Sequence, residues 1–131
     1  MNAEQSMVKE FHERFGVPVT ERPALPDQKR CDLRVELIRE EFEEMQAALA
    51  AGDIVEVADA LGDLKYVIDG AALEFGINLE PVFREIHRSN MSKIWPDGEV
   101  HRREDGKVVK SPEYSPADVA GEIERQRAVS A

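Results

Sequence analysis

The chain contains 131 residues with a formal net charge of −10 and a hydrophobic share of 42%, which suits one folded domain and argues against general disorder. The negative charge disfavours a sequence-independent grip on DNA or RNA, and no apolar run approaches the roughly 20 residues that cross a bilayer. With no apolar signal core at the N-terminus and one cysteine, too few for an internal disulfide, the composition favours a cytoplasmic protein without nucleic-acid or membrane partners.

The first half of the chain predicts three helices joined by two connections. Residues 3–15 have a helix-favouring composition, and residues 17–27 contain three prolines and form a connector. Two longer helices follow, at about 29–51 and about 54–75. The residues that separate these elements are Gly16, then Gly52 with the helix-capping Asp53, and finally Gly76.

The second half predicts two shorter helices with a polar region between them. One helix spans about residues 79–92, and a last, exposed helix begins at Ser115. The intervening residues 93–116 are polar and carry three prolines and two glycines. This region allows one short strand pair around Asp105-Gly106, formed by residues 99–103 and 107–110. The predicted class is all-α, a helical bundle built on a central αα-hairpin, with a C-terminal polar loop region and a short helix.

The whole net charge lies in one third of the chain. Residues 1–35 and residues 81–131 each hold equal numbers of acidic and basic side chains. Residues 36–80 hold twelve acidic side chains against only Arg39 and Lys65. A fold does not require such a concentration, which therefore points to function.

Helical projection separates these carboxylates into two groups. On the second predicted helix, Glu41 falls inside the apolar arc, Glu44 lies at its edge and Glu40 lies one step further out. On the third helix, three carboxylates fall within about 60° of one another at one edge of the apolar arc: Glu56, Asp59 and Asp63. We assign four others to the solvated surface: Glu36, Glu43, Asp69 and Glu74.

Two acidic stripes facing a shared seam indicate a cation site. Like charges one helical turn apart cost about 0.2–0.5 kcal/mol per pair even when exposed, and the cost grows where the dielectric is lower. Carboxylates are suitable hard ligands for Mg²⁺ or Mn²⁺. The alternative is that the stripes are simply solvated, and helix capping explains Glu56 equally well. The sequence contains no EF-hand loop, no P-loop and no pair of Glu-x-x-His motifs.

At this point a family resemblance appears. Glu40-Glu41-x-x-Glu44, followed by EVADALGDLKYV, resembles the MazG-like all-α NTP pyrophosphohydrolase superfamily. The strings FGINLEPVFREIHRSNMSK and DGKVVKSPEYSPADV resemble a branch of it with dimeric dUTPase-type members, and the likeness covers roughly residues 7–120.

The family pattern is E-x-x-E followed by E-x-x-D, and its second half fits this chain in two registers. By motif alone it is Glu56-x-x-Asp59. If Tyr66-Val67 is the anchor instead, Asp63 is the family aspartate, and Ala60 then stands where a glutamate is expected. We favour Asp63 as a ligand, assisted by Asp59 and Glu56.

The resemblance implies a Mg²⁺-dependent hydrolase, with Mn²⁺ as a possible substitute, that converts a (d)NTP to (d)NMP and pyrophosphate and serves nucleotide-pool sanitation. The resemblance favours dUTP or another pyrimidine dNTP as the substrate. Glu41 or Glu40 is the expected catalytic base. The implied metal ligands are Glu40, Glu41, Glu44, Glu56, Asp59 and Asp63. The candidate substrate-binding residues are Asn90, Lys93, Trp95, Lys107, Lys110 and Tyr114.

The resemblance also implies an organisation. We expect residues 1–131 to form a single domain whose catalytic hairpin spans about 29–75, completed by formation of a homodimer or a higher homo-oligomer. Two alternatives stay open: an enzyme similar to phosphoribosyl-ATP pyrophosphohydrolase, and a non-catalytic nucleotide-binding or interaction module on the same fold. The Ala60 departure keeps the second alternative open.

Overall fold

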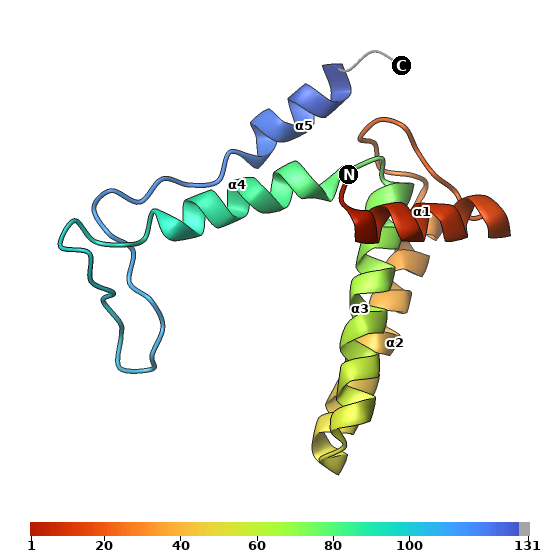
Figure 1. Ribbon diagram of the computed structural model, residues 1–131. Helices are drawn as coiled ribbons and strands as arrows, with labels where there is room; N and C mark the ends of the chain where they lie inside the picture. Colours follow the sequence, from red (N-terminus) through yellow and green to blue (C-terminus); the bar gives the residue numbers. More distant parts are fainter. Residues whose placement is uncertain (129–131) are drawn as a thin grey trace. The chain divides into compact units, whose positions relative to one another are not determined.

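The computed structural model describes residues 1–128, which fold into helices and irregular segments in two compact units, residues 1–79 and 80–128. Figure 1 shows the order of the elements along the chain. The helices are α1 (Ala3–Phe15), α2 (Gln28–Ala51), α3 (Ile54–Glu74), α4 (Leu79–Met91) and α5 (Val119–Ala128). Within the described residues no strand ladder forms, so the predicted all-α class is confirmed.

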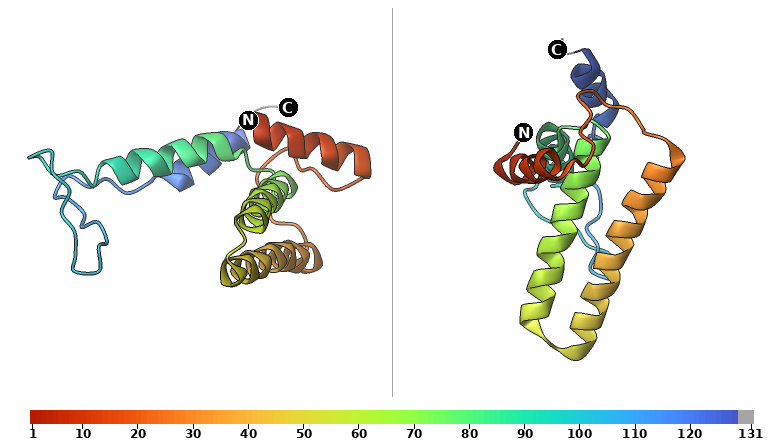
Figure 2. Two further views of the ribbon diagram at one scale, coloured as in Figure 1. Left: turned by 60° about the horizontal axis from the view of Figure 1, so that its bottom comes forward. Right: turned by 90° about the vertical axis from the view of Figure 1, so that its right-hand side faces the viewer.

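The centre of the first unit is the predicted αα-hairpin of α2 and α3, which lie side by side and antiparallel (Figure 2). Gly52 ends α2 with a φ of 66°, a left-handed conformation that glycine adopts at no steric cost. The side chain of Asp53 then accepts hydrogen bonds from the backbone N–H groups of Val55 and Glu56 at 3.1 and 3.2 Å. The turn and its cap lie where the sequence predicted them.

Helix α1 packs across α3 near the C-terminal end of that helix. The buried Gln5 fixes it there, because its amide donates to the carbonyl of Ile77 and accepts from the N–H of Leu79. The connector after α1 also joins α3, since Thr20 and Ala24 donate to the carbonyls of Leu73 and Phe75 at 2.9 Å. The segment rich in proline is therefore a fixed part of the unit.

The second unit contains α4, α5 and the segment between them. Helix α5 begins at Val119 and not at the predicted Ser115, because Asp118 is the residue that caps it, accepting from the N–H of Gly121 at 2.9 Å. The predicted strand pair reduces to one isolated antiparallel bridge, between Arg102 and Val108, closed by a turn at Asp105-Gly106. No helix in the described part of the chain has the length and hydropathy to span a membrane.

Candidate functional site

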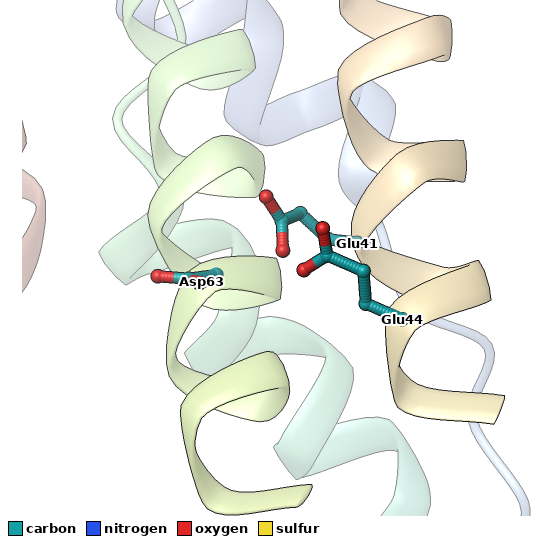
Figure 3. A group of neighbouring side chains, drawn as sticks. All are labelled: Glu41, Glu44 and Asp63. Atoms are coloured by element: carbon teal, nitrogen blue, oxygen red, sulfur yellow. The ribbon is translucent and has the colours of Figure 1, made fainter. Parts of the chain in front are cut away.

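Three of the predicted carboxylates converge between α2 and α3. One oxygen from each of Glu41, Glu44 and Asp63 lies within 4.8 Å of the corresponding oxygens of the other two. Figure 3 shows Glu41 and Glu44 extending from α2 toward α3, which carries Asp63. The structure thus places residues from both halves of the expected motif in one cluster, which we call the acidic cluster.

Small side chains allow the two helices to approach closely at this level. Ala48 on α2 and Ala60 on α3 are buried, with 7% and 3% of their surfaces exposed, and both line the groove beside Glu44. Ala60 is the residue that stands where the family pattern expects a glutamate. A longer side chain at this buried position would have to displace neighbouring atoms of the hairpin.

The local electrostatics disfavour three ionised carboxylates in this place. Partial burial raises the pKa of Glu41 above its usual range, and the neighbouring charges of Glu44, Asp63 and Asp59 raise it further. Burial also raises the pKa of Asp63, with added repulsion from Asp59 and Glu44. The chain therefore concentrates negative charge where it is unfavourable without a counter-charge.

One atom of the acidic cluster is unsatisfied. Oε2 of Glu41 is buried, and it has no hydrogen-bond partner among the described residues. An unpaired buried carboxylate oxygen is costly, and a bound cation removes the cost. Opposite oxygen ligands of Mg²⁺, Mn²⁺ or Ca²⁺ lie about 4–5 Å apart, given metal–oxygen distances of about 2.0–2.6 Å. The acidic cluster, 4.8 Å across, therefore has both the donor chemistry and the dimensions of a divalent-cation site.

The other three predicted metal ligands lie outside this group of three. Glu56 and Asp59 line a groove together with Glu44, one turn toward the tip of the hairpin, and Asp59 acts on the acidic cluster through its charge. The backbone N–H of Glu56 is part of the Asp53 cap. Glu40 is exposed on α2. Asp63 is therefore the α3 carboxylate that belongs to the acidic cluster, and Asp59 lies beside it.

The six predicted substrate-binding residues all belong to the second unit. Asn90 is exposed near the end of α4, and Lys93 is half-buried just beyond it. Lys107 and Lys110 are exposed, and the ammonium of Lys110 lies 4.6 Å from the centre of the Tyr114 ring in a cation–π contact. That contact occupies one face of Tyr114.

Trp95 has a structural role within its own loop. Its indole Nε1 donates to the carbonyl of Val109 at 3.2 Å, and its ring stacks on His101 with centroids 4.1 Å apart. Asp97 in turn lies 3.2 Å from Nε2 of His101. These contacts hold the two sides of the 99–110 loop together and leave at most one indole face for a ligand.

A buried ionic network is the largest feature that sequence reasoning missed. Glu74, assigned above to the surface, is 1% exposed, and its carboxylate accepts two hydrogen bonds from Arg30 and one from Arg34, at 2.6–2.8 Å. These guanidinium groups lower the pKa of Glu74, despite its burial. Asp69 was wrongly assigned in the same way, because it is buried at the side of α3 that faces α1.

The network continues from Arg34 to His12 on α1. Nδ1 of His12 lies 3.0 Å from the carbonyl oxygen of Pro18, which can only accept, so this nitrogen carries the proton. Nε2 is then free to accept from Nη2 of Arg34 at 3.4 Å. Burial lowers the pKa of His12, which favours this neutral form. For Arg34, the signal available in the sequence was its position seven residues before Glu41. This spacing places both side chains on the same side of α2.

The sequence and the fold of the chain are similar to those of known proteins. The model of the phosphoribosyl-ATP pyrophosphohydrolase family matches residues 8–90, which include the whole hairpin. A solved structure from Exiguobacterium sp. 255-15, provisionally named an NTP pyrophosphohydrolase, is 25% identical, with a TM-score of 0.53, and the match covers 95% of this chain and 96% of that one.

A curated relative is the uncharacterised protein L479 of Acanthamoeba polyphaga mimivirus, which is 36% identical over 77 residues. That match covers 56% of this chain and only 31% of the viral protein, so the chain spans about a third of its length. The family model covers more than half of the chain and carries the assignment. The chain belongs to the phosphoribosyl-ATP pyrophosphohydrolase family, within the MazG-like all-α superfamily.

Proposed function

We propose that this protein is a divalent-cation-dependent nucleoside triphosphate pyrophosphohydrolase that converts a (d)NTP to (d)NMP and pyrophosphate in the cytoplasm. The observation that carries the proposal is the acidic cluster with its unsatisfied Glu41 oxygen, in a chain of this family. Mg²⁺ is the proposed metal, with Mn²⁺ as a substitute. When bound, such a cation offsets the negative charge of the carboxylates and of the phosphate oxygens.

The residues of the chain would then have separate roles in binding the cation and in catalysis. Glu41, Glu44 and Asp63 hold the cation, and Asp59 and Glu56 add negative charge beside them. Glu41 is the proposed general base, because its carboxylate extends from α2 into the acidic cluster, beside the proposed cation and the water that it would activate. A water oxygen bonds to the α-phosphorus, the α–β phosphoanhydride bond breaks, pyrophosphate leaves, and the water proton goes to Glu41. Glu40 stays the alternative base.

A deoxypyrimidine triphosphate, dUTP first, is the proposed substrate, on the strength of the HRSNMSK and GKVVK strings. Asn90, Lys93, Lys107 and Lys110 are the proposed contacts to substrate, together with the half-buried rings of Trp95 and Tyr114. A second candidate is phosphoribosyl-ATP, which the description of the matching family favours.

One experiment separates these readings. The protein is incubated with dNTPs, NTPs and phosphoribosyl-ATP in Mg²⁺, and the products are identified by chromatography. A nucleoside monophosphate with pyrophosphate is the expected result. Release of orthophosphate would show that a different bond breaks. No turnover of any substrate in Mg²⁺ or Mn²⁺ would favour the non-catalytic module.

We also propose that the protein is a homodimer, because α2 and α3 each carry an exposed apolar row. The rows repeat every seven residues and are 43–76% exposed: Val35, Phe42 and Leu49 on α2, and Ile54, Leu61 and Ile68 on α3. A seven-residue apolar repeat is the pattern of helices that pack against other helices. Because α2 and α3 are antiparallel, a twofold axis would pair the α2 row of one copy with the α3 row of the other.

A further inference from the structure

A second cavity of the first unit lies between α1, α2 and α3, on the side of the acidic cluster away from the hairpin turn. Its volume is about 440 Å³, within the range of small-molecule sites. Most of its wall is apolar or aromatic, formed by Phe11, Leu33, Leu37, Tyr66 and Val67. Phe11 and Tyr66 meet edge to face, with ring centroids 5.8 Å apart. Such walls suit a flat heterocycle, because every nucleobase has a π-face that stacks on aromatic rings.

The cavity wall also contains a cationic donor that the fold leaves unused. Arg34 is 5% exposed; its Nε donates to Glu74 and its Nη2 to His12. Its remaining nitrogen, Nη1, donates no hydrogen bond to any described residue. Water in the cavity can reach Nη1, since Oε2 of Glu41 is the buried polar side-chain atom that lacks a partner among the described residues. A ligand oxygen that displaces this water can accept a hydrogen bond from Nη1.

Gly70 provides the room that this nitrogen occupies. A Cβ atom at Gly70 would lie 3.0 Å from Nη1 of Arg34 and 3.1 Å from Nε2 of His12. Both Arg34 and Gly70 line the cavity. The hydrogen bonds to Glu74 and His12 fix the guanidinium from two sides, so its free edge is held in place before any ligand arrives.

The register of the hairpin links this donor to the acidic cluster. Arg34 precedes Glu41 by seven residues on α2, and Gly70 follows Asp63 by seven on α3. Seven helical residues span about 10.5 Å. That length is similar to the distance from the 5′-phosphate of a nucleotide to the far edge of its base. Leu37 and Val67 line the path between the two sites, one turn from the acidic cluster.

We infer that Arg34 is a specificity-determining residue that donates from Nη1 to a keto oxygen of the substrate base. The inference rests on the proposed function, because the acidic cluster must hold the triphosphate for the base to reach this cavity. Uracil, thymine and guanine carry keto oxygens, whereas adenine presents an amino donor at the corresponding edge. A site built around a buried donor rejects substrates without the acceptor, because the donor is left unpaired.

The test compares substrates on the unmodified protein. In Mg²⁺, kcat/KM is measured for dUTP, for dATP and for two dUTP analogues, each lacking one of the two keto oxygens. We expect dATP and one analogue to be at least tenfold poorer than dUTP. Equal kcat/KM values for dUTP and both analogues would overturn the inference, and this arm requires no variant to fold.

A variant then tests whether Arg34 causes the lower kcat/KM of the poorer analogue relative to dUTP, a ratio that we call the penalty. Arg34→Lys keeps the positive charge beside Glu74 but removes the fork of N–H groups. We expect the penalty for the poorer analogue to fall to about twofold or less in this variant. The control is Arg39→Lys on the same helix, exposed and outside the cavity, which should keep the full penalty. A full penalty in folded Arg34→Lys would overturn the assignment.

Binding separates this inference from the proposed function. Affinities for hydrolysis-resistant α,β-imido forms of dUTP and of the same analogues are measured by calorimetry in Mg²⁺. A tenfold loss for one analogue supports the role of Arg34 even if no substrate is hydrolysed. Equal affinities alongside hydrolysis of dUTP would reject the role of Arg34 and leave the proposed function standing.

Discussion

Glu41 combines features that conflict in a protein without metal. Its carboxylate reaches into the hairpin seam, one oxygen is buried without a partner, and the charges of Glu44 and Asp63 act against its ionisation. Removing such a charge should stabilise the metal-free fold, because it relieves repulsion and desolvation together. Glu41 therefore costs stability in the metal-free protein, and the proposed cation would offset that cost.

The variant Glu41→Gln tests this role of the Glu41 charge, because it keeps the shape of the side chain and removes the charge. We expect hydrolysis to fall at least 100-fold, since both a ligand and the proposed base are lost. Without metal, the melting temperature should rise, and added Mg²⁺ or Mn²⁺ should no longer increase it. Glu43→Gln, exposed two residues away, should change neither quantity. Full activity in Glu41→Gln would show that the acidic cluster is not part of the active site.

The raised pKa values of Glu41 and Asp63 also predict a pH dependence. In the metal-free protein these groups favour the protonated form, so folding stability decreases as pH rises from the ordinary carboxyl range through the raised pKa values. A metal needs the ionised form, so its binding should strengthen over the same interval and release protons. Calorimetric Mn²⁺ titrations between about pH 4.5 and 7.5 should show this trend. Affinity that did not change over that interval would contradict it.

At the scale of elements, the ion pairs of Glu74 connect the last turn of α3 to the first turns of α2. Arg30 and Arg34 are a helical turn apart on α2, and both donate to the same carboxylate. Arg34 then contacts His12 on α1, so three helices meet in one network. Because the network also fixes the donor that lines the cavity, its loss should affect both the fold and the site.

Glu74→Gln should lower the free energy of unfolding by about 3–5 kcal/mol, since it leaves the buried guanidinium group of Arg34 and the partly exposed one of Arg30 without a counter-charge. Urea denaturation measures this loss. Glu36→Gln removes the exposed pair with Arg39 and should change stability by less than about 1 kcal/mol. The lowered pKa of Glu74 means that its contribution is present above the ordinary glutamate pKa and lost as pH falls through the lowered value. Equal effects of both substitutions would contradict a buried network.

The sequence predicted the elements well where the signals are local. Gly16 and Gly52 end their helices as expected, and Asp53 caps α3. The start of α5 was misplaced because serine and aspartate are both good caps, and Asp118 is the one in use. Glu74 was misassigned for a different reason: its partners lie 40 and 44 residues away, and no local pattern reports contacts at that separation.

The candidate site shows the same limit. Helical projection correctly placed Glu41 and Glu44 toward the seam, because the faces of one helix follow from its period. The choice between Asp59 and Asp63 depends on the register of α3 against α2, which packing determines. In the structure Asp63 joins the cluster and Asp59 lies beside it. The unused donor of Arg34 could not be foreseen, because it depends on three helices meeting at one residue.

At the scale of the whole molecule, the first unit leaves much apolar surface uncovered for its size. Few large apolar side chains in it are buried, whereas its two longest helices expose six of them in rows. Exposed apolar patches of this extent mark interaction sites in soluble proteins. A second copy is the proposed occupant, because the rows on α2 and α3 match each other in length and in spacing.

Leu61→Glu tests this proposal, because it places a charge at the middle of the α3 row. Light scattering at micromolar concentration should give twice 14.7 kDa for the unmodified protein and 14.7 kDa for the variant. Burying an unpaired carboxylate in an apolar interface costs far more than the leucine contributes, so the two copies should separate. Phe83→Glu on α4, also at an exposed apolar residue but outside both rows, should leave the mass doubled. A monomeric mass for the unmodified protein, or an unchanged mass for Leu61→Glu, would refute pairing through these rows.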